Sequence, residues 1–347
     1  MLSKLIGNDD IKHTLRRLIA GKRVPNSLLF AGEDGVGKRQ FALEIVKAFI
    51  CLEPTEDGAC DVCAACTRTD KLVIPEGDGR VKEDFEKVFF SEHLDVGMVV
   101  PFKRHILVKA IRDLERNANF RPYEAAERFF IVDDANKMND ESSNALLKIL
   151  EEPPSTSFIF LITSRPDSML ATIRSRCQTL RFAPVETAKI EQYLISQRAF
   201  SRDEARLSAS LSRGSIGRAV SMNVKQFCEQ RNRMFAVLQS VIKTSDIAAL
   251  LAISEQMNDA KNKDRFEENL SILESLIHDV WSLKIGGDRS RVVNADLKED
   301  LESLARSSGS SDLPSWMHKI TALRDNLSVN INRKIAADAL FVSMTGL

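Results

Sequence analysis

Short apolar runs alternate with helical patterns along the first half of the chain. Leu28–Gly32, Arg128–Ala135 and Phe158–Ser164 consist largely of apolar residues, as is typical of strands that are buried on both faces. The stretches Arg39–Ile50 and Ser142–Glu152 instead repeat apolar residues every three or four positions, which is the period of a helix. Buried strands separated by helices predict a parallel sheet with helices on its faces.

From about residue 183 the strand pattern fades and short helices follow. After Lys225 almost every segment is an amphipathic helix, and Phe266–Leu283 is the best example. We therefore predict three domains: an α/β domain over 1–183, a small helical domain over 184–225 and an all-helical domain over 226–347. The segment Leu72–Val88 lacks either period and is expected to be a surface insertion, and we assign no role to residues 72–92.

The composition narrows the class of protein. Lysine plus arginine equals aspartate plus glutamate at 49 each, so the net charge is zero and any contact with DNA should be local or shared with partners. The longest apolar runs fall far below the roughly 18–20 residues that a membrane span requires. The first residues, MLSKLIGNDD, lack the features of a signal peptide. We expect a cytoplasmic protein that makes no membrane contact.

The first predicted strand ends in the sequence GEDGVGKR, which is a phosphate-binding loop with one unusual position. The pattern G-x-x-x-x-G-K-[ST] is met by Gly32, Gly37 and Lys38, but Arg39 stands where the hydroxyl residue belongs. The glycines, with Gly35 between them, let backbone N–H groups face phosphates, whereas the missing hydroxyl would bind Mg²⁺. The alternative is a glycine-rich turn without a ligand. We expect a degenerate site that binds ATP and Mg²⁺ weakly or not at all and hydrolyses ATP poorly.

Two adjacent acids end the second predicted strand. Asp133 would contact Mg²⁺ directly or through water, and Asp134 stands where many ATPases of this kind use glutamate to orient the attacking water. Aspartate is one methylene shorter, which lowers the expected hydrolysis further. The alternative is that Asp134 caps the helix that follows it.

The connector TIRSRCQTLRF follows the third predicted strand, and two of its arginines lie in the short segment Arg174–Arg176. The guanidinium groups of Arg174 and Arg176 can clamp phosphate in a bidentate manner. Arginines on a short connector are otherwise ordinary solvated surface, so only the neighbouring motifs give these two a functional interpretation.

Four of the six cysteines lie close together in the sequence, with the spacing C-x8-C-x2-C-x2-C. They are Cys51, Cys60, Cys63 and Cys66. Without a secretion signal such clustering favours a metal over disulfides, and four thiolates fit a closed, structural Zn²⁺ site. The alternative is four free thiols.

Together these pieces resemble the bacterial clamp-loader family of AAA+ proteins. The matching segments are LIGNDD, SLLFAGEDGVGK, the four-cysteine group, FFIVDDANKMNDESSNALLKILEEPP, FIFLITSRPDSMLATIRSRCQ and GSIGRA. They follow one another in order over roughly Leu5–Val220, and the triplet Ser175–Cys177 is the most specific of them. Within the family, the delta-prime type of subunit is the most similar.

The resemblance implies a RecA-like nucleotide fold that carries the zinc module at 51–66, followed by a helical lid and a helical collar. It also implies a stator subunit that does not hydrolyse ATP, with tau/gamma and delta subunits as partners, and with the sliding clamp and primed DNA reached through the complex. Arg176 would be an arginine finger for the ATP site of the neighbouring motor subunit. Thr163 and Arg218 fall on the two sensor positions. Leu94, where the family tends to have proline, departs from the pattern.

Two other functions compete with this interpretation. A tau/gamma-like motor that hydrolyses ATP keeps Thr or Ser after the loop lysine, so Arg39 argues against it. A zinc-dependent nucleic-acid-binding module is disfavoured by the zero net charge and by the lack of an aromatic-basic surface pattern.

Overall fold

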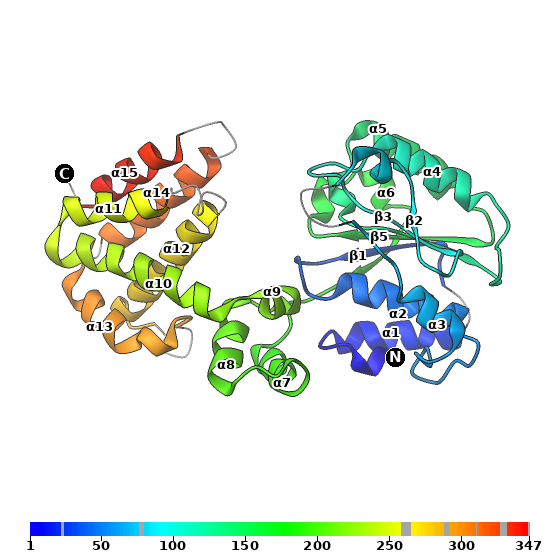
Figure 1. Ribbon diagram of the computed structural model, residues 1–347, viewed down its shortest axis with the longest axis horizontal. Coiled ribbons are helices and arrows are strands. Elements are labelled where there is room, and N and C mark those ends of the chain that lie inside the picture. Colours follow the sequence, from blue (N-terminus) through cyan, green and yellow to red (C-terminus); the bar gives the residue numbers. More distant parts are fainter. Residues whose placement is uncertain are drawn as a thin grey trace. The chain divides into compact units, whose positions relative to one another are not determined.

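The computed structural model describes residues 1–21, 24–75, 80–257, 265–287, 292–309, 311–326 and 332–345. These residues form two compact units, Met1–Ser221 and Met222–Leu347. The first contains a six-stranded sheet with helices, and the second is helical (Figure 1). Within the described ranges, we find no helix that is both long enough and apolar enough to span a bilayer.

The sheet of the first unit is parallel except at one edge. Its strand order is β2-β3-β4-β5-β1-β6, and only the pair β2–β3 is antiparallel. The strands are β1 (Ser27–Ala31), β2 (Phe89–Phe90), β3 (Val96–Val99), β4 (Arg128–Val132), β5 (Ser157–Thr163) and β6 (Gln178–Arg181). The predicted parallel sheet is confirmed, and the three strands expected from their apolar runs are β1, β4 and β5. Their carboxyl ends meet at one edge, where loops can share a site.

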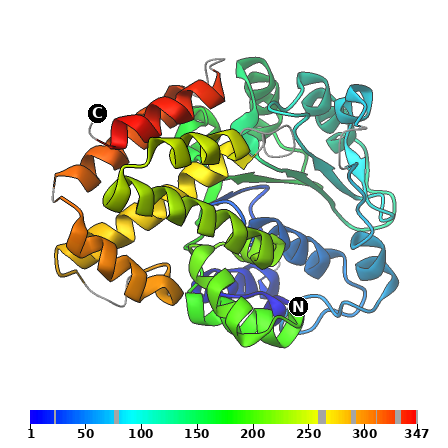
Figure 2. The same cartoon turned by 60° about the vertical axis from the view of Figure 1, so that its left-hand side comes forward.

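Helices cover both faces of this sheet, as Figures 1 and 2 show. Leu28 and Phe30 of β1 pack into one core together with Phe41 of α2, whereas Leu29 packs into the opposite core together with Ile111 of α4. This alternation follows from the two-residue repeat of a strand. The helices of the first face are α1 (Asp9–Ala20), α2 (Lys38–Ile50) and α3 (Ala64–Thr69), and those of the second are α4 (Val108–Ala118), α5 (Asp140–Glu151) and α6 (Ala171–Arg174).

Three short helices complete the first unit. They are α7 (Thr187–Arg198), α8 (Arg202–Leu211) and α9 (Ile216–Ser221), close to the positions that the sequence predicts. Ile190, Leu194 and Ala205 belong to a small core of their own, and a capping box between Ser201 and Glu204 starts α8. Because these helices share a compact unit with the sheet, the division at residue 183 stays a proposal.

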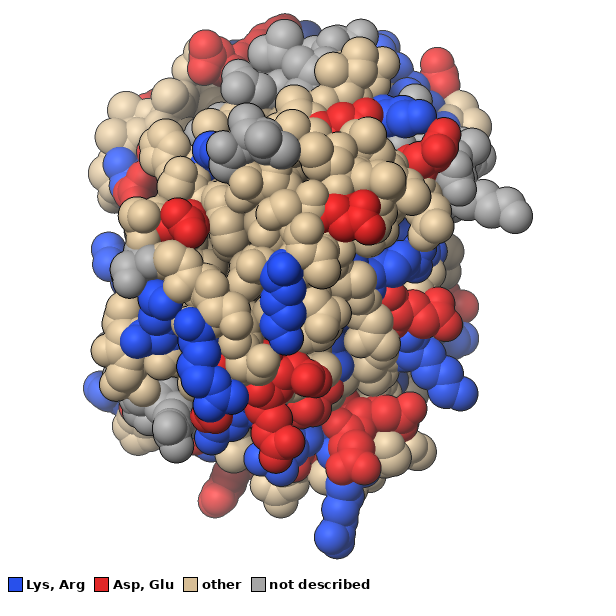
Figure 3. Space-filling model, turned by 90° about the vertical axis from the view of Figure 1, so that its left-hand side faces the viewer, with Lys and Arg blue, Asp and Glu red and all other residues tan. Residues whose placement is uncertain are grey.

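The second unit is built around one long helix, α12 (Phe266–Lys284), which the periodicity predicts almost to the residue. Its apolar side chains, such as Leu273 and Ile277, are fully buried among the other helices. Those helices are α10 (Val224–Gln239), α11 (Ile247–Met257), α13 (Lys298–Ser307), α14 (Asp312–Asn326) and α15 (Arg333–Met344). In the face drawn in Figure 3, acidic and basic side chains of the described residues lie intermingled beside a broad uncharged area. That face therefore offers no continuous basic surface.

The predicted insertion at Leu72–Val88 is anchored at its carboxyl end. Residues 76–79 of it lie outside the described ranges. Phe85, in the short 3₁₀ helix Lys82–Glu86, is buried, and its ring contacts Phe89 and Phe102. The insertion thus packs against the sheet beside β2 instead of lying entirely on the surface.

Candidate functional site

The phosphate-loop motif connects β1 to α2, as its sequence predicts. Its lysine, however, is turned into the loop: Lys38 is 5% exposed, and its Nζ donates to the carbonyl oxygens of Gly32 at 2.6 Å and Glu33 at 2.7 Å. Burial lowers the pKa of Lys38, while Asp34 and other nearby acids act in the opposite direction. The ammonium group that would meet phosphates is therefore bound to the backbone of its own loop.

The small helical part lies directly against this loop. The backbone N–H of Gly217 donates to the carbonyl oxygen of Gly35 at 2.8 Å. A Cβ atom added at Gly35 would lie 2.2 Å from Oγ of Ser215, and the φ of Gly35 is +77°. Only glycine fits both the backbone conformation and this close approach. The loop glycines therefore serve as a contact surface for the segment that starts α9.

Arg39 forms the central interaction of the site. Its Nε donates to Oδ2 of Asp133 at 2.7 Å, and a second guanidinium nitrogen pairs with the same oxygen. The other carboxylate oxygen accepts the N–H of Asp134 at 3.1 Å. The side chain of Asp133 is only 9% exposed. A Mg²⁺ ion would have to displace the guanidinium from this carboxylate, so the residues present do not fit the metal.

Asp134 is also occupied. Its Oδ2 accepts a hydrogen bond from Nζ of Lys137 at 2.8 Å, and its backbone lies in the left-handed region with a φ of +51°. It precedes the 3₁₀ turn Ala135–Lys137 without a capping hydrogen bond from its side chain. In this arrangement the carboxylate is bound to a lysine and is not free to orient a water.

Thr163 lies at the carboxyl end of β5 and is fully buried. Its hydroxyl donates to Oδ1 of Asn136 at 3.0 Å and accepts the N–H of Arg165 at 3.1 Å, and its carbonyl oxygen accepts the N–H of Gly32 at 3.2 Å. It therefore connects the phosphate loop to the turn after β4. Sequence reasoning overlooked Asn136, although it lies inside the DDANK stretch next to the two acids.

An open cavity of about 440 Å³ adjoins the loop, with Lys38, Arg39 and Asp133 in its lining. The arginine that lines it from the small helical part is Arg198, at the end of α7, whereas Arg218 is exposed and is not among the lining residues. Arg198 carried no sequence signal, because it is one of many surface arginines.

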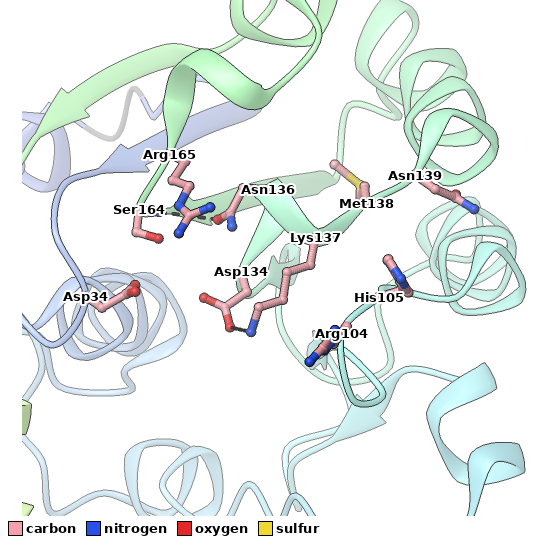
Figure 4. A pocket seen from close by; sticks show the side chains of 10 residues that line it. All are labelled: Asp34, Arg104, His105, Asp134, Asn136, Lys137, Met138, Asn139, Ser164 and Arg165. Carbon is pink, nitrogen blue, oxygen red and sulfur yellow. Dashed lines mark hydrogen bonds and ion pairs between the residues drawn. The ribbon is translucent and has the colours of Figure 1, made fainter. Parts of the chain in front are cut away.

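A second cavity, of about 630 Å³, lies at the carboxyl edge of the sheet and is shown in Figure 4. Lys137 and Arg165 approach it from one side, and Arg104 and His105 from the other. Within the described ranges, the guanidinium groups of Arg104 and Arg165 have no hydrogen-bond or ion-pair partner. Free guanidinium groups around a polar cavity can bind phosphate oxygens.

Arg176 stands outside both cavities, in the turn between α6 and β6. Its guanidinium donates to the carbonyl oxygen of Thr172 at 2.9 Å and to Oε1 of Glu151 at 2.8 Å, and its side chain is 35% exposed. The turn is fixed by Ile173 and Cys177, which are buried on either side of it, and burial raises the pKa of Cys177 to about 12. The serine-arginine-cysteine triplet thus presents one exposed guanidinium from a turn whose backbone is held by buried side chains.

The four clustered cysteines come together as the spacing predicts. All their sulfur atoms lie within 4.8 Å of one another, and the Cys51 and Cys63 sulfurs are 3.9 Å apart. Tetrahedral Zn–S bonds of about 2.3 Å place sulfurs about 3.8 Å apart. Burial acts to raise the pKa of Cys63, but N–H donors of Cys66 and Leu52 outweigh it and lower this pKa to about 6. Four soft donors in this arrangement fit a structural metal ion.

The cysteine loop is bound to α2 by buried charges. Lys47 is almost fully buried, and its Nζ contacts Glu44 at 2.6 Å, Asp61 at 2.9 Å and Asp70 at 3.1 Å. Burial acts to raise the pKa of Asp61, but hydrogen bonds from Lys4 and Lys47 lower it well below its usual range. The cysteine loop is therefore held to the sheet domain by several ion pairs, of which that of Lys47 is the most buried.

Comparisons with known proteins show which family the chain resembles. Residues 7–186 match the family described as "DNA polymerase III, delta subunit", and residues 225–342 match "DNA polymerase III, delta subunit, C terminal". DNA polymerase III subunit delta' of Bacillus subtilis is 28% identical over 311 residues, which cover 89% of this chain and 88% of that protein. Its namesake in Escherichia coli is 25% identical over 312 residues, with coverages of 89% and 86%. A solved structure of a gamma subunit-related protein from Thermotoga maritima covers 96% of this chain and 99% of its own, at 16% identity and a TM-score of 0.40.

Proposed function

The chain belongs to the DNA polymerase III delta subunit family, and we propose that it is the delta-prime stator of a clamp loader. In this role it supports the ATP-dependent loading of the sliding clamp onto primed DNA without hydrolysing ATP itself. The names of the relatives support the assignment, because the two described above are both delta-prime subunits and cover most of this chain.

One observation carries the proposal. In an ATPase, Mg²⁺ would balance the negative charge of Asp133, whereas here the guanidinium of Arg39 balances it. Its ion pair with Asp133, together with the engagement of Lys38 by its own loop, leaves the nucleotide site without a metal ligand or a free phosphate-binding amine. Arg176, by contrast, is exposed and held on a fixed turn. We assign it the role of arginine finger for the ATP site of a neighbouring tau/gamma subunit.

Two further parts of the proposal concern the metal and the DNA. We propose that Cys51, Cys60, Cys63 and Cys66 hold a structural Zn²⁺, since the four thiols are close together and chemically suited to it. We also propose that the cavity flanked by Arg104, Lys137 and Arg165 contributes phosphate contacts when the assembled loader binds primed DNA.

The test is reconstitution of the loader with tau/gamma and delta subunits, followed by ATPase measurements with clamp and primed DNA. Arg176→Ala should lower the DNA-stimulated rate, because an arginine finger is worth about 10³–10⁵ in kcat at the site it serves. Arg174→Ala is the matched control, since it lies on the same connector and its guanidinium is paired with Asp167. An unchanged rate for Arg176→Ala would refute the finger role.

The competing motor function has its own test. The isolated chain should show negligible ATP turnover, with or without Mg²⁺. Robust turnover that Lys38→Ala abolishes would instead assign the chain to the hydrolysing tau/gamma type. Tight binding of the lone subunit to primed DNA, lost on zinc chelation, would favour the nucleic-acid-binding module.

A further inference from the structure

The last turn of α5 carries a charge arrangement that its local structure does not favour. The helix ends at Glu151 and is followed by Glu152, although the carboxyl end of a helix disfavours negative charge. Oε1 of Glu151 accepts a hydrogen bond from Arg176 at 2.8 Å. Among the described residues, Glu152 is exposed and its carboxylate has no such partner. The ion pair with Arg176 therefore stabilises a negative charge that the carboxyl end of α5 disfavours.

The contact with Glu151 leaves most of the guanidinium free. An arginine has five N–H donors, and here one is used by Glu151 and one by the carbonyl oxygen of Thr172. The remaining donors can still reach an anionic oxygen while both contacts persist. A long arginine side chain loses rotamer entropy when it is fixed in one place. The two contacts fix it before any partner arrives.

We propose that Glu151 is a positioning residue for Arg176 in the assembled loader, an inference that rests on the finger role proposed above. Its carboxylate holds the guanidinium in one direction, so that the neighbouring ATP site receives an arginine that is already ordered. Glu151 touches neither nucleotide nor phosphate itself. Its effect must therefore disappear when the arginine is absent, and it must change kcat and not the affinity for ATP.

The experiment compares Glu151→Ala, Glu151→Gln and Glu152→Ala in the reconstituted loader with clamp and primed DNA. We expect Glu151→Ala to lower kcat about tenfold, because a misplacement of about 1 Å can cost up to about 10²-fold, and to leave KM for ATP unchanged. Glu151→Gln keeps an oxygen that can accept the hydrogen bond and should restore part of the loss. Glu152→Ala removes a neighbouring charge without this contact and should behave like the wild type.

A double variant separates positioning from a general effect on the helix. In the Arg176→Ala background, Glu151→Ala should cause no further loss of kcat. A further loss, or equal effects of Glu151→Ala and Glu152→Ala, would overturn the proposal. If Arg176→Ala itself had no effect, the finger role would fail first, whereas a strong effect of Arg176→Ala with none of Glu151→Ala would refute the positioning role alone. Unchanged assembly by native mass spectrometry shows that all variants are folded.

Discussion

The substitution Arg39→Thr tests whether the arginine stands in for a metal ion. It restores the hydroxyl of the phosphate-loop pattern and removes the guanidinium from Asp133 in one step. The variant should therefore lose stability in the absence of Mg²⁺ and regain it when Mg²⁺ is added. The wild-type protein should show no such response, because its own side chain already occupies the carboxylate.

The expected loss follows from the exposure of the two partners. A hydrogen bond to a charged group is worth about 1.5–3 kcal/mol. Since the Arg39 side chain is 52% exposed and that of Asp133 only 9%, solvent screening reduces this to about 1–2 kcal/mol. For a unit of this size each kcal/mol shifts the melting temperature by about 2–4 °C. Arg39→Thr should thus melt about 2–8 °C lower without Mg²⁺.

The expected recovery follows from linkage. If the restored site binds Mg²⁺ with a Kd of about 1 mM, then about 10 mM Mg²⁺ stabilises the folded state by about 1.4 kcal/mol. Thermal unfolding of the purified chain, measured at matched ionic strength with and without Mg²⁺, gives both quantities. Arg39→Ala is the control, because it frees Asp133 but lacks the hydroxyl, and should recover less. Equal Mg²⁺ responses of wild type and Arg39→Thr would refute the reasoning.

Three further outcomes follow from other parts of the structure. Native mass spectrometry should find one zinc per chain, and both chelation and Cys63→Ser should lower the melting temperature, whereas a metal-free mass and no response to chelator would contradict the site. Lys47→Met should cost up to about 3 kcal/mol in urea unfolding, because it removes the buried cation that Glu44 and Asp61 share and leaves them only the partly exposed Lys4 and the N-terminal ammonium. The folded state lowers the pKa of Asp61, so the ionised carboxylate stabilises the fold fully above the ordinary pKa of 3.8, and this contribution is lost as the pH falls below it. In Lys47→Met the free energy of unfolding should therefore fall less steeply as the solution is acidified. Arg104→Ala and Arg165→Ala should each reduce the salt dependence of primed-DNA binding by the loader by about one unit of slope, and unchanged slopes would exclude phosphate contacts there.

The sequence predicts those parts of the fold whose signal is local. The strands β1, β4 and β5 are buried along their whole length, so their apolar runs are nearly continuous. It missed β6, which has four residues and exposes three of them at the sheet edge, and β3, where Gly97 interrupts a short apolar run. A strand of only four residues can be recognised from the strands that pair with it, but those strands are distant in the sequence.

The same distinction applies to the candidate site. The motif glycines, Lys38 and the cysteines were found because spacing alone defines them. The ion pair of Arg39 could not be predicted, because its partner Asp133 is 94 residues away in the sequence. The motif indicates only that the usual hydroxyl residue is missing. Asn136 and Arg198 were missed for a related reason: their roles come from where β4 and α7 end, and no residue pattern marks them.

The pairing of Arg39 with Asp133 also balances the charge of a carboxylate that lies where ATPases of the P-loop type bind Mg²⁺. A buried carboxylate without a cation is costly, so replacing the hydroxyl residue by an uncharged one would leave Asp133 as a destabilising group. An arginine at position 39 removes the metal ligand and supplies the missing charge in a single change. The effects of substituting the two charged residues should therefore depend on each other. Asp133→Asn should destabilise the wild type, because it leaves the guanidinium of Arg39 unpaired. In the Arg39→Ala background the same substitution should stabilise the protein, because no cation remains there to balance the acid. Additive effects of the two substitutions would mean that Arg39 is merely a surface side chain beside an abandoned site.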